Sequence, residues 1–377
     1  MGCFELRARQ QARATPAPPQ PVGLALVLVL CAGPALAAGA APDRLADAIA
    51  RWQQRLRSPA PVDDELREIR AGAAPLLAQA EQALAQGKRW LALSRLERVW
   101  TDLEAAEYRS GIAGDLRGQM SELEREWQRL GPELASDRAP GPRPAFELLP
   151  AAARALAEAA LSQMPVYYEA SLDYGRNTAP EYGLFYLGAA RAQRDFVALV
   201  AGLPRRPAGL APLAPRDVSG EIGALRDELL TAYAPPLSID SHPVFIRISA
   251  LLKEAEELTA AGSRYGALLR LLDARVRLAR LTHPGRSLSA EEAARRGADF
   301  ASRRDASPRD TSLQRLFLET ALFSAADPDP ATHGGEIAAA IFDDVLPAFP
   351  SLLGAAPPRP PERLAEATVT LVRWPYT

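Results

Sequence analysis

Cysteine is almost absent from this chain, and lysine and asparagine are as scarce. The only two cysteines, Cys3 and Cys31, lie within the first 31 residues. Of the 44 basic residues only Lys88 and Lys253 are lysine, and Asn177 is the only asparagine. Codon bias in a GC-rich genome explains this excess of arginine better than phosphate binding does. The arginines alone therefore do not indicate a nucleic-acid-binding protein.

Motifs that would commit the chain to a reaction or a cofactor are also missing. The sequence has no Gly-x-Ser-x-Gly elbow, no glycine-rich phosphate loop and no His-Glu-x-x-His helix. Its three histidines, His242, His283 and His333, are far apart, whereas a metal site needs three or four ligands. We therefore predict no catalytic residue, metal or cofactor. An enzyme whose carboxylates meet from distant helices is the alternative.

The N-terminus has the order of a secretion signal. Three arginines between residues 7 and 13 precede the apolar run 24–31, and Ala35-Leu36-Ala37 is a small-x-small cleavage site. We predict cleavage after Ala37 and a periplasmic or secreted mature protein. A helix over residues 24–37 would span roughly 21 Å at about 1.5 Å per residue, less than a hydrocarbon core of roughly 30 Å. An N-terminal membrane anchor is the alternative.

Removal of residues 1–37 would change the chemistry of the chain. Both cysteines would be lost, so the mature protein could form neither a disulfide nor a thiolate metal site. Three arginines and one glutamate would also be lost, which leaves 41 basic against 45 acidic residues. A mildly acidic protein lacks the electrostatic footprint for nucleic acid or anionic lipid. We expect no nucleic-acid partner and no stable membrane insertion after cleavage.

Nearly every segment after the leader has apolar residues at helical spacing. Spacings of three and four place such residues on one helix face, which is then buried. The clearest stripes are Leu45, Ile49, Trp52 and Leu56; Leu116, Met120, Leu123, Trp127 and Leu130; Ile222, Leu225, Leu229 and Tyr233; and Ile337, Ile341, Val345 and Phe349. We predict an all-α protein, a solenoid or bundle of stacked helical hairpins in two related parts.

Glycine, proline and capping residues predict where these helices begin and end. Gly87, Gly131-Pro132, Gly202 and Gly262 are stop signals, and Ser289 with Glu292 forms a capping box. Only residues 368–373 alternate as a strand does. The proline-rich stretches are 139–144, 204–215 and 357–361, and the second is the best domain boundary. The predicted organisation is a signal peptide at 1–37, helical parts at 38–203 and 216–356, a linker at 204–215 and a proline-rich tail at 357–377.

The two helical parts share a repeated sequence. Residues 76–96 align without gaps on residues 251–271, and 11 of the 21 positions are identical. In each copy a glycine can adopt the left-handed conformation that ends one helix, and the next helix begins at once. The most informative identical pairs are Glu81 with Glu256, Gly87 with Gly262, Arg89 with Arg264, and Arg95 with Arg270. The repeat predicts one helical hairpin in each part.

Small and apolar residues around each turn have the spacing of a known repeat. They are Ala80, Gly87, Ala92 and Leu96 in the first copy and Ala255, Gly262, Ala267 and Leu271 in the second. Over about 60 residues the chain resembles tetratricopeptide (TPR-like) repeats, although the 34-residue period is not sustained. The aromatic residue follows the glycine by three positions instead of two, and no proline closes the unit. The resemblance implies stacked helix pairs with a concave surface that binds protein or peptide.

Tyrosine is concentrated in one segment. Five of the nine tyrosines lie within residues 167–186. A tyrosine pairs a flat apolar face with a hydroxyl and is immobilised at low entropic cost, which suits a binding groove. The candidate ligand- or peptide-binding residues are Tyr167, Tyr168, Tyr174, Arg176, Tyr182 and Tyr186. Tyr182 and Tyr186 also share a helical stripe with Ala189 and Phe196, so the cluster is either core or binding surface.

These patterns favour an interaction protein over an enzyme. We predict an exported helical-repeat protein that mediates protein–protein or peptide interactions in the bacterial cell envelope, without catalysis. Its partner would be an envelope protein or peptide. The alternative is a periplasmic ligand-binding helical bundle with a tyrosine-rich pocket.

Overall fold

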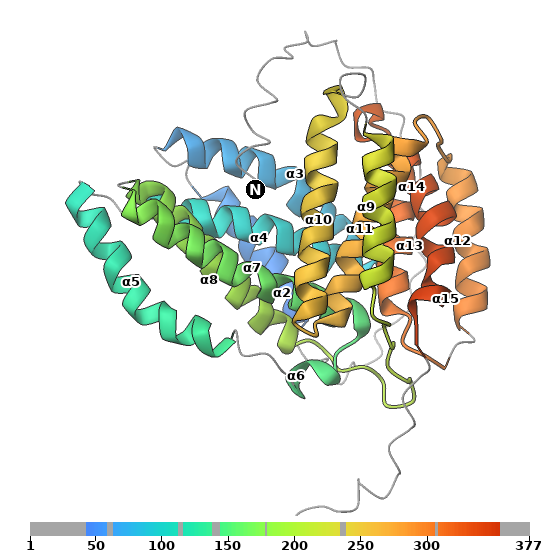
Figure 1. Cartoon of the computed structure of the whole chain (residues 1–377), viewed down its shortest axis with the longest axis horizontal. Coiled ribbons are helices and arrows are strands. Elements are labelled where there is room, and N and C mark those ends of the chain that lie inside the picture. Colours follow the sequence, from blue (N-terminus) through green and yellow to red (C-terminus); the bar gives the residue numbers. More distant parts are fainter. Residues whose placement is uncertain are drawn as a thin grey trace, which may run out of the picture. The chain divides into compact units, whose positions relative to one another are not determined.

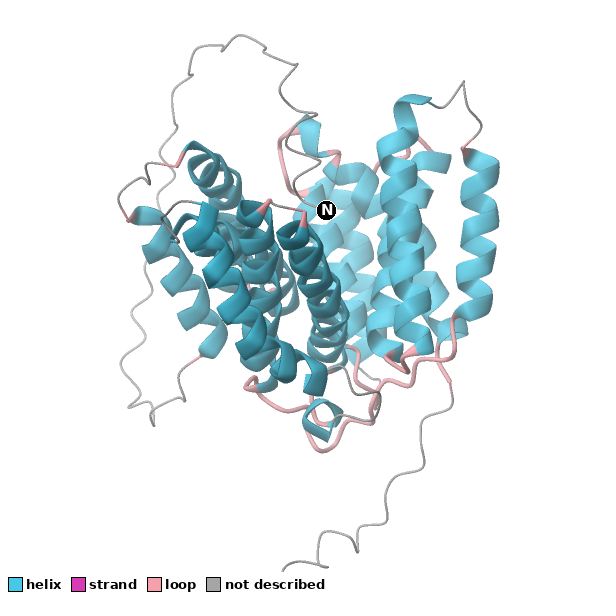
Figure 2. Cartoon of the chain, turned by 60° about the vertical axis from the view of Figure 1, so that its left-hand side comes forward, coloured by secondary structure: helices cyan, strands magenta, loops and turns pink. Residues whose placement is uncertain are grey.

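The computed structural model describes residues 43–58, 63–111, 116–137, 144–177, 179–233, 239–305 and 308–354. These residues form helices joined by loops, and no strand occurs among them (Figures 1 and 2). The all-α prediction is thereby confirmed. No helix in the described ranges combines the length and apolarity that a membrane crossing needs. The predicted signal peptide, the strand-like stretch 368–373 and the tail from 357 lie outside these ranges.

The first half of the fold comprises residues 44–201. Its helices are α2 (Arg44–Arg57), α3 (Asp64–Ala85), α4 (Arg89–Gly111), α5 (Leu116–Asp137), α6 (Pro144–Glu147), α7 (Ala151–Arg176) and α8 (Pro180–Ala201).

The second half comprises residues 219–352. Its helices are α9 (Ser219–Ala232), α10 (His242–Ala260), α11 (Arg264–Thr282), α12 (Ala290–Asp305), α13 (Ser312–Ala325), α14 (Gly334–Ala340) and α15 (Phe349–Leu352). The short 3-10 helices are η1 (Ile239–Ser241), η2 (Pro330–Thr332) and η4 (Leu346–Ala348), and η3 (Ile341–Val345) is a π-helix.

The two halves have the same helix order in space. In the first half neighbouring helices follow the order α2, α3, α4, α8, α7, and α5 packs on both α8 and α7. In the second half the order is α9, α10, α11, α14, α13, α12. The 175-residue shift of the sequence repeat also carries the bounds of α2 onto those of α9. The likeness of the two halves therefore extends beyond the repeated hairpin sequence.

Each half contains the predicted hairpin. Gly87 and Gly262 have φ values of 72° and 76°, in the left-handed region. Beyond each glycine the next backbone N–H reaches back into the first helix, from Lys88 to the Ala83 carbonyl and from Ser263 to the Leu258 carbonyl, both at 2.8 Å. The small residues that let the helices approach are all fully buried: Ala80, Ala92, Ala255 and Ala267.

The predicted apolar stripes face the interior. The buried members include Leu45, Ile49 and Trp52; Leu123; Ile222, Leu225 and Leu229; and Ile341, Val345 and Phe349. Half of the predicted capping box is present: the Glu292 N–H donates to the Ser289 hydroxyl at 3.1 Å, but the Glu292 carboxylate accepts from Arg295 and Arg296 instead of from the Ser289 N–H. Asp63 likewise caps α3 by accepting from two backbone N–H groups.

The prediction that a helix ends at Gly131-Pro132 is wrong, because α5 continues through both residues to Asp137. A proline inside a helix removes one hydrogen bond but need not end the helix when packing holds the two sides in line. Here Leu123 is buried between α5 and its neighbours, and the Trp127 indole N–H donates to the Ser171 hydroxyl at 3.0 Å. Contacts with α7 and α8 therefore override the local signal.

The proline-rich segment 204–215 is bonded to both halves. The Arg206 N–H donates to the Leu148 carbonyl at 2.7 Å. Ala211 donates to the Pro308 carbonyl at 2.9 Å and accepts from the Asp310 N–H at 2.7 Å. The described residues from Arg44 to Gly354 accordingly group as one compact unit. The segment therefore connects the two halves and is hydrogen-bonded to each of them.

Where the two halves meet, one glutamate from each half accepts hydrogen bonds from the start of a helix in the other half. Glu158 of α7 accepts from the backbone N–H groups of Tyr265 and Gly266, both at 2.9 Å, at the start of α11. Glu319 of α13 accepts from the first N–H groups of α4, those of Trp90 at 3.1 Å and Leu91 at 3.0 Å. A carboxylate satisfies the unpaired N–H groups of a helix start and favours its positive dipole end. Each half therefore caps one helix of the other half.

A second repeated motif supplies these two glutamates. The pattern Arg-x-x-x-Glu-x-Ala-Leu occurs at 154–161 and at 315–322. In both copies the arginine lies beside its glutamate, with Arg154 Nε 2.7 Å from Glu158 and Arg315 Nε 3.4 Å from Glu319. The two motifs are 161 residues apart, whereas the hairpins are 175 apart. An alignment without gaps cannot detect both repeats at one shift.

Candidate functional site

Four of the predicted tyrosines form a continuous stack, which we call the tyrosine row. Tyr167 and Tyr174 project from α7, and Tyr182 and Tyr186 project from α8, which packs along α7. The ring centroids are 6.3 Å apart from Tyr167 to Tyr186, 5.2 Å from Tyr186 to Tyr174 and 5.6 Å from Tyr174 to Tyr182. Spacings of seven on α7 and four on α8 keep each pair on one helix face.

The tyrosine row runs from the core to the surface. Phe196, further along α8 on the same stripe, is completely buried. Tyr186 and Tyr167 are half-buried, whereas Tyr174 and Tyr182 are 39% and 47% exposed. The alternatives of core and binding surface therefore apply to different ends of one row. Its inner end belongs to the packed helices, and its outer end presents ring surface to solvent.

Tyr168 does not join the tyrosine row. Its hydroxyl donates to the Trp127 carbonyl at 3.4 Å, and its ring packs on the apolar cluster that includes Leu123, Met164 and Leu184. This cluster joins α5 to α7 and α8. The arrangement gives Tyr168 a structural role, although its neighbour Tyr167 belongs to the row.

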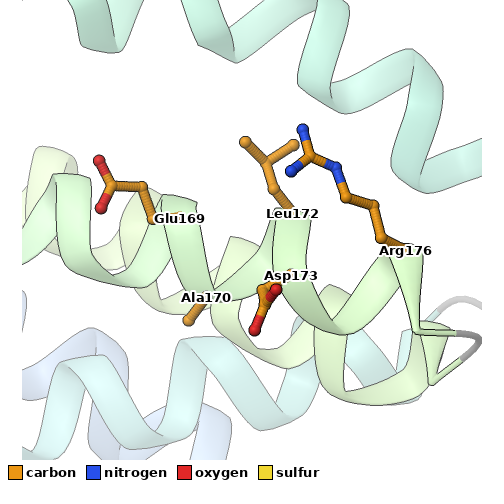
Figure 3. A pocket seen from close by; sticks show the side chains of 5 residues that line it. All are labelled: Glu169, Ala170, Leu172, Asp173 and Arg176. Carbon is orange, nitrogen blue, oxygen red and sulfur yellow. The ribbon is translucent and has the colours of Figure 1, made fainter.

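Arg176 lies in an open pocket on α7. The pocket has a volume of about 360 Å³ and is lined by Glu169, Ala170, Leu172, Asp173 and Arg176. Figure 3 shows Leu172 and Arg176 extending to one side of the helix and Asp173 to the other. The pocket thus combines both signs of charge with a small apolar surface. It is a shallow feature of the same helix that carries Tyr167 and Tyr174.

A polar cluster adjoins the inner end of the tyrosine row. The Gln193 amide of α8 donates to the Glu97 carboxylate at 3.2 Å and to the Thr101 hydroxyl at 2.6 Å, both on α4. The Arg270 guanidinium of α11 donates to Glu254 of α10 at 2.7 Å. Sequence reasoning missed this cluster because its members come from four helices. The only signal was Arg270, which is matched by Arg95 in the repeat.

The environment of this cluster shifts the pKa values of its acids. Burial raises the pKa of the Tyr167 hydroxyl well above its usual value, and the nearby carboxylates of Glu97 and Glu254 add to the shift. Burial also raises the pKa of the Glu97 carboxyl, against the attraction of the Arg270 guanidinium. Tyr167 therefore remains protonated near neutral pH. It can donate and accept hydrogen bonds but is a poor base.

The site offers stacked rings, a polar inner end and an open outer end. Within the described ranges, no group of three or more His, Cys, Asp or Glu side chains could hold a metal ion. Comparisons with protein-family models, curated proteins and solved structures find no match.

Proposed function

We propose that this chain is an exported, non-catalytic binding protein of the bacterial cell envelope that binds a segment of a protein or peptide on the tyrosine row. The observation that carries the proposal is the exposed outer end of the row. Tyr174 and Tyr182 present ring surface on two packed helices, although most large apolar side chains in the described ranges are buried. Tyrosine supplies large contact area at a low cost in conformational entropy.

Two further features support a binding role. The rings of the tyrosine row are held by stacking along α7 and α8, so a partner would meet a surface that is already ordered. About 60 residues around the Gly87 and Gly262 turns resemble tetratricopeptide repeats, a family that binds protein or peptide. Export rests on the leader pattern of residues 1–37.

Site-specific photo-crosslinking tests this function. A photoreactive residue replaces Tyr182 in the full-length chain, expressed in its native envelope, and crosslinked products are identified by mass spectrometry. Leu230 on α9 is the matched control, because it is 58% exposed and far from the row in sequence. We expect a defined partner crosslinked from position 182 and absent from position 230. Equal crosslinking from both positions, or none from 182 in a folded chain, would contradict the proposal.

A small-molecule role is the second candidate, suggested by the open, shallow pocket on α7, the helix that also carries Tyr167 and Tyr174. Under this alternative the protein is a periplasmic ligand-binding bundle. Native mass spectrometry of protein purified from the envelope would then show a bound small molecule that is lost in an Arg176→Ala variant. A ligand-free protein that still forms crosslinks at position 182 would favour the first proposal.

A further inference from the structure

The two repeated hairpins carry an arginine at the same position, Arg95 on α4 and Arg270 on α11. The Arg270 Nε donates to the Glu254 carboxylate at 2.7 Å, and an Asp273 carboxylate oxygen lies 3.9 Å from the Arg270 Nη1. Although burial lowers the pKa of this guanidinium, the two carboxylates and that of Glu97 raise it above its usual value. Arg270 is therefore a cation that is well supplied with counter-charge.

Arg95 has no such partners. Its Nε is buried without a hydrogen-bond partner, and among the described residues Arg95 forms no ion pair. Burial lowers the pKa of its guanidinium and the charge of Arg98 adds to this, whereas Asp327, in the loop after α13, acts in the opposite direction. A partly buried cation without a partner costs free energy that a bound anion would offset. The unpaired Nε of Arg95 is the same atom that, in Arg270, binds a carboxylate.

The two copies of the repeat differ at the positions that supply the counter-charge. The 175-residue shift that aligns Arg95 with Arg270 also aligns each acid that acts on Arg270 with a residue that is not acidic. The first half therefore keeps the arginine without the acids that would neutralise it. The aligned pairs are Glu254 with Gln79, Asp273 with Arg98, and Glu97, which acts on Arg270 from the other half, with Leu272.

We propose that Arg95 binds a carboxylate of a ligand, which takes the place that the Glu254 carboxylate has at Arg270. The Nη groups of Arg95 form no hydrogen bond with a described residue and, unlike the Nε, keep contact with solvent. A carboxylate that enters from solvent therefore meets one Nη group and then the Nε, and this edge of a guanidinium matches its two oxygens. No residue of the tyrosine row takes part, so the inference is independent of the proposed function.

Calorimetric titration of the full chain with defined anions tests the proposal. The probes are succinate, hexa-glutamate and inorganic phosphate, compared at one fixed ionic strength. We expect a carboxylate probe to bind more tightly than phosphate. Arg95→Gln should weaken that binding roughly tenfold or more, because a hydrogen bond between charged groups is lost. Arg205→Gln is the control, because it removes the same charge from an exposed side chain and should leave the affinity unchanged.

Two further substitutions keep Arg95 and change the charge around it. Gln79→Glu restores the acid that the second half has at the aligned position. The new carboxylate should pair with Arg95, weaken the binding of the carboxylate probe roughly tenfold and raise the midpoint of urea unfolding. Asp327→Asn removes a carboxylate that attracts Arg95, so it should strengthen the binding of the probe.

The outcomes separate the possible occupants of the site, once circular dichroism shows that each variant is folded. Binding of hexa-glutamate alone would assign the carboxylate to an acidic polypeptide, and binding of succinate alone would assign it to a free acid; both support the proposal. If no probe binds the folded parent, water alone solvates Arg95 and the proposal is overturned. An affinity that Arg95→Gln or Gln79→Glu leaves unchanged, or tighter binding of phosphate than of either carboxylate, would overturn it as well.

Discussion

Glu319 provides a sharp test of how the halves are held together. Its side chain is buried, and its carboxylate accepts from the N–H groups of Trp90 and Leu91 in the first turn of α4, in the other half. Burial raises its pKa from 4.5 to about 7, although these two N–H groups and the nearby Arg315 and Lys88 act in the opposite direction. Ionised Glu319 is therefore less favourable in the folded protein than in the unfolded chain.

The sign of the pH effect follows from this shift. Between pH 4.5 and 7 the folded state holds a proton that the unfolded state has lost, so the contribution to stability is full below about 4.5 and is lost as pH rises through about 7. At about 1.4 kcal/mol per unit, the folded protein should lose about 2.5 kcal/mol from this group between pH 5 and pH 8. Glu319→Gln keeps an acceptor oxygen for both N–H groups and removes the titration.

Urea unfolding of the parent and the Glu319→Gln variant at pH 5, 6, 7 and 8 measures this effect. The difference in free energy of unfolding, parent minus variant, should fall by about 2.5 kcal/mol over that range. Glu257→Gln on α10 is the control, because that carboxylate is exposed and removing its charge leaves the junction intact. A difference that stays flat, or that rises with pH, would refute a pKa of Glu319 that burial raises in the folded protein.

Two other substitutions test the junction and the packing of the helices. Glu158→Ala leaves two buried N–H groups at the start of α11 without a partner. It should lower the free energy of unfolding in urea by about 2–3 kcal/mol. A decrease below about 0.5 kcal/mol would exclude the cap as a stabilising contact. Gly188→Ala would place a Cβ 2.9 Å from the Ala105 Cα on α4, so overpacking should cost about 1–3 kcal/mol. Gly220→Ala in α9 is its control, because nothing lies within 4 Å of the added Cβ; equal losses at the two sites would argue against close packing of α4 and α8.

Local patterns determined much of this fold. Helical spacing of apolar residues identified the buried faces of α2 and α9, and a glycine between two helical stretches identified each hairpin turn. Such features follow from a few neighbouring residues, because helix periodicity and a left-handed φ depend on short-range sterics. The concentration of tyrosines in 167–186 was visible in the sequence for the same reason.

Tertiary packing decided what those elements do together. The sequence did not distinguish Tyr167, which joins the tyrosine row, from Tyr168, which supports α5 on the opposite side. Nor did it indicate that Pro132 would lie inside a helix. Both outcomes depend on which helices become neighbours, and α4 packs on α8 instead of on the helix that follows it in the chain.

The sequence by itself therefore determined the helices, the two hairpins and the presence of a repeat. Only the tertiary structure decided that the repeated halves cap each other, because the Glu319 carboxylate meets an N–H group 229 residues away. A contact of that range depends on the packing of whole helices, which no short segment encodes. A glutamate carboxyl has the same intrinsic pKa at every position of the chain. Burial between the two halves raises the pKa of Glu319 and places its carboxylate where it caps α4.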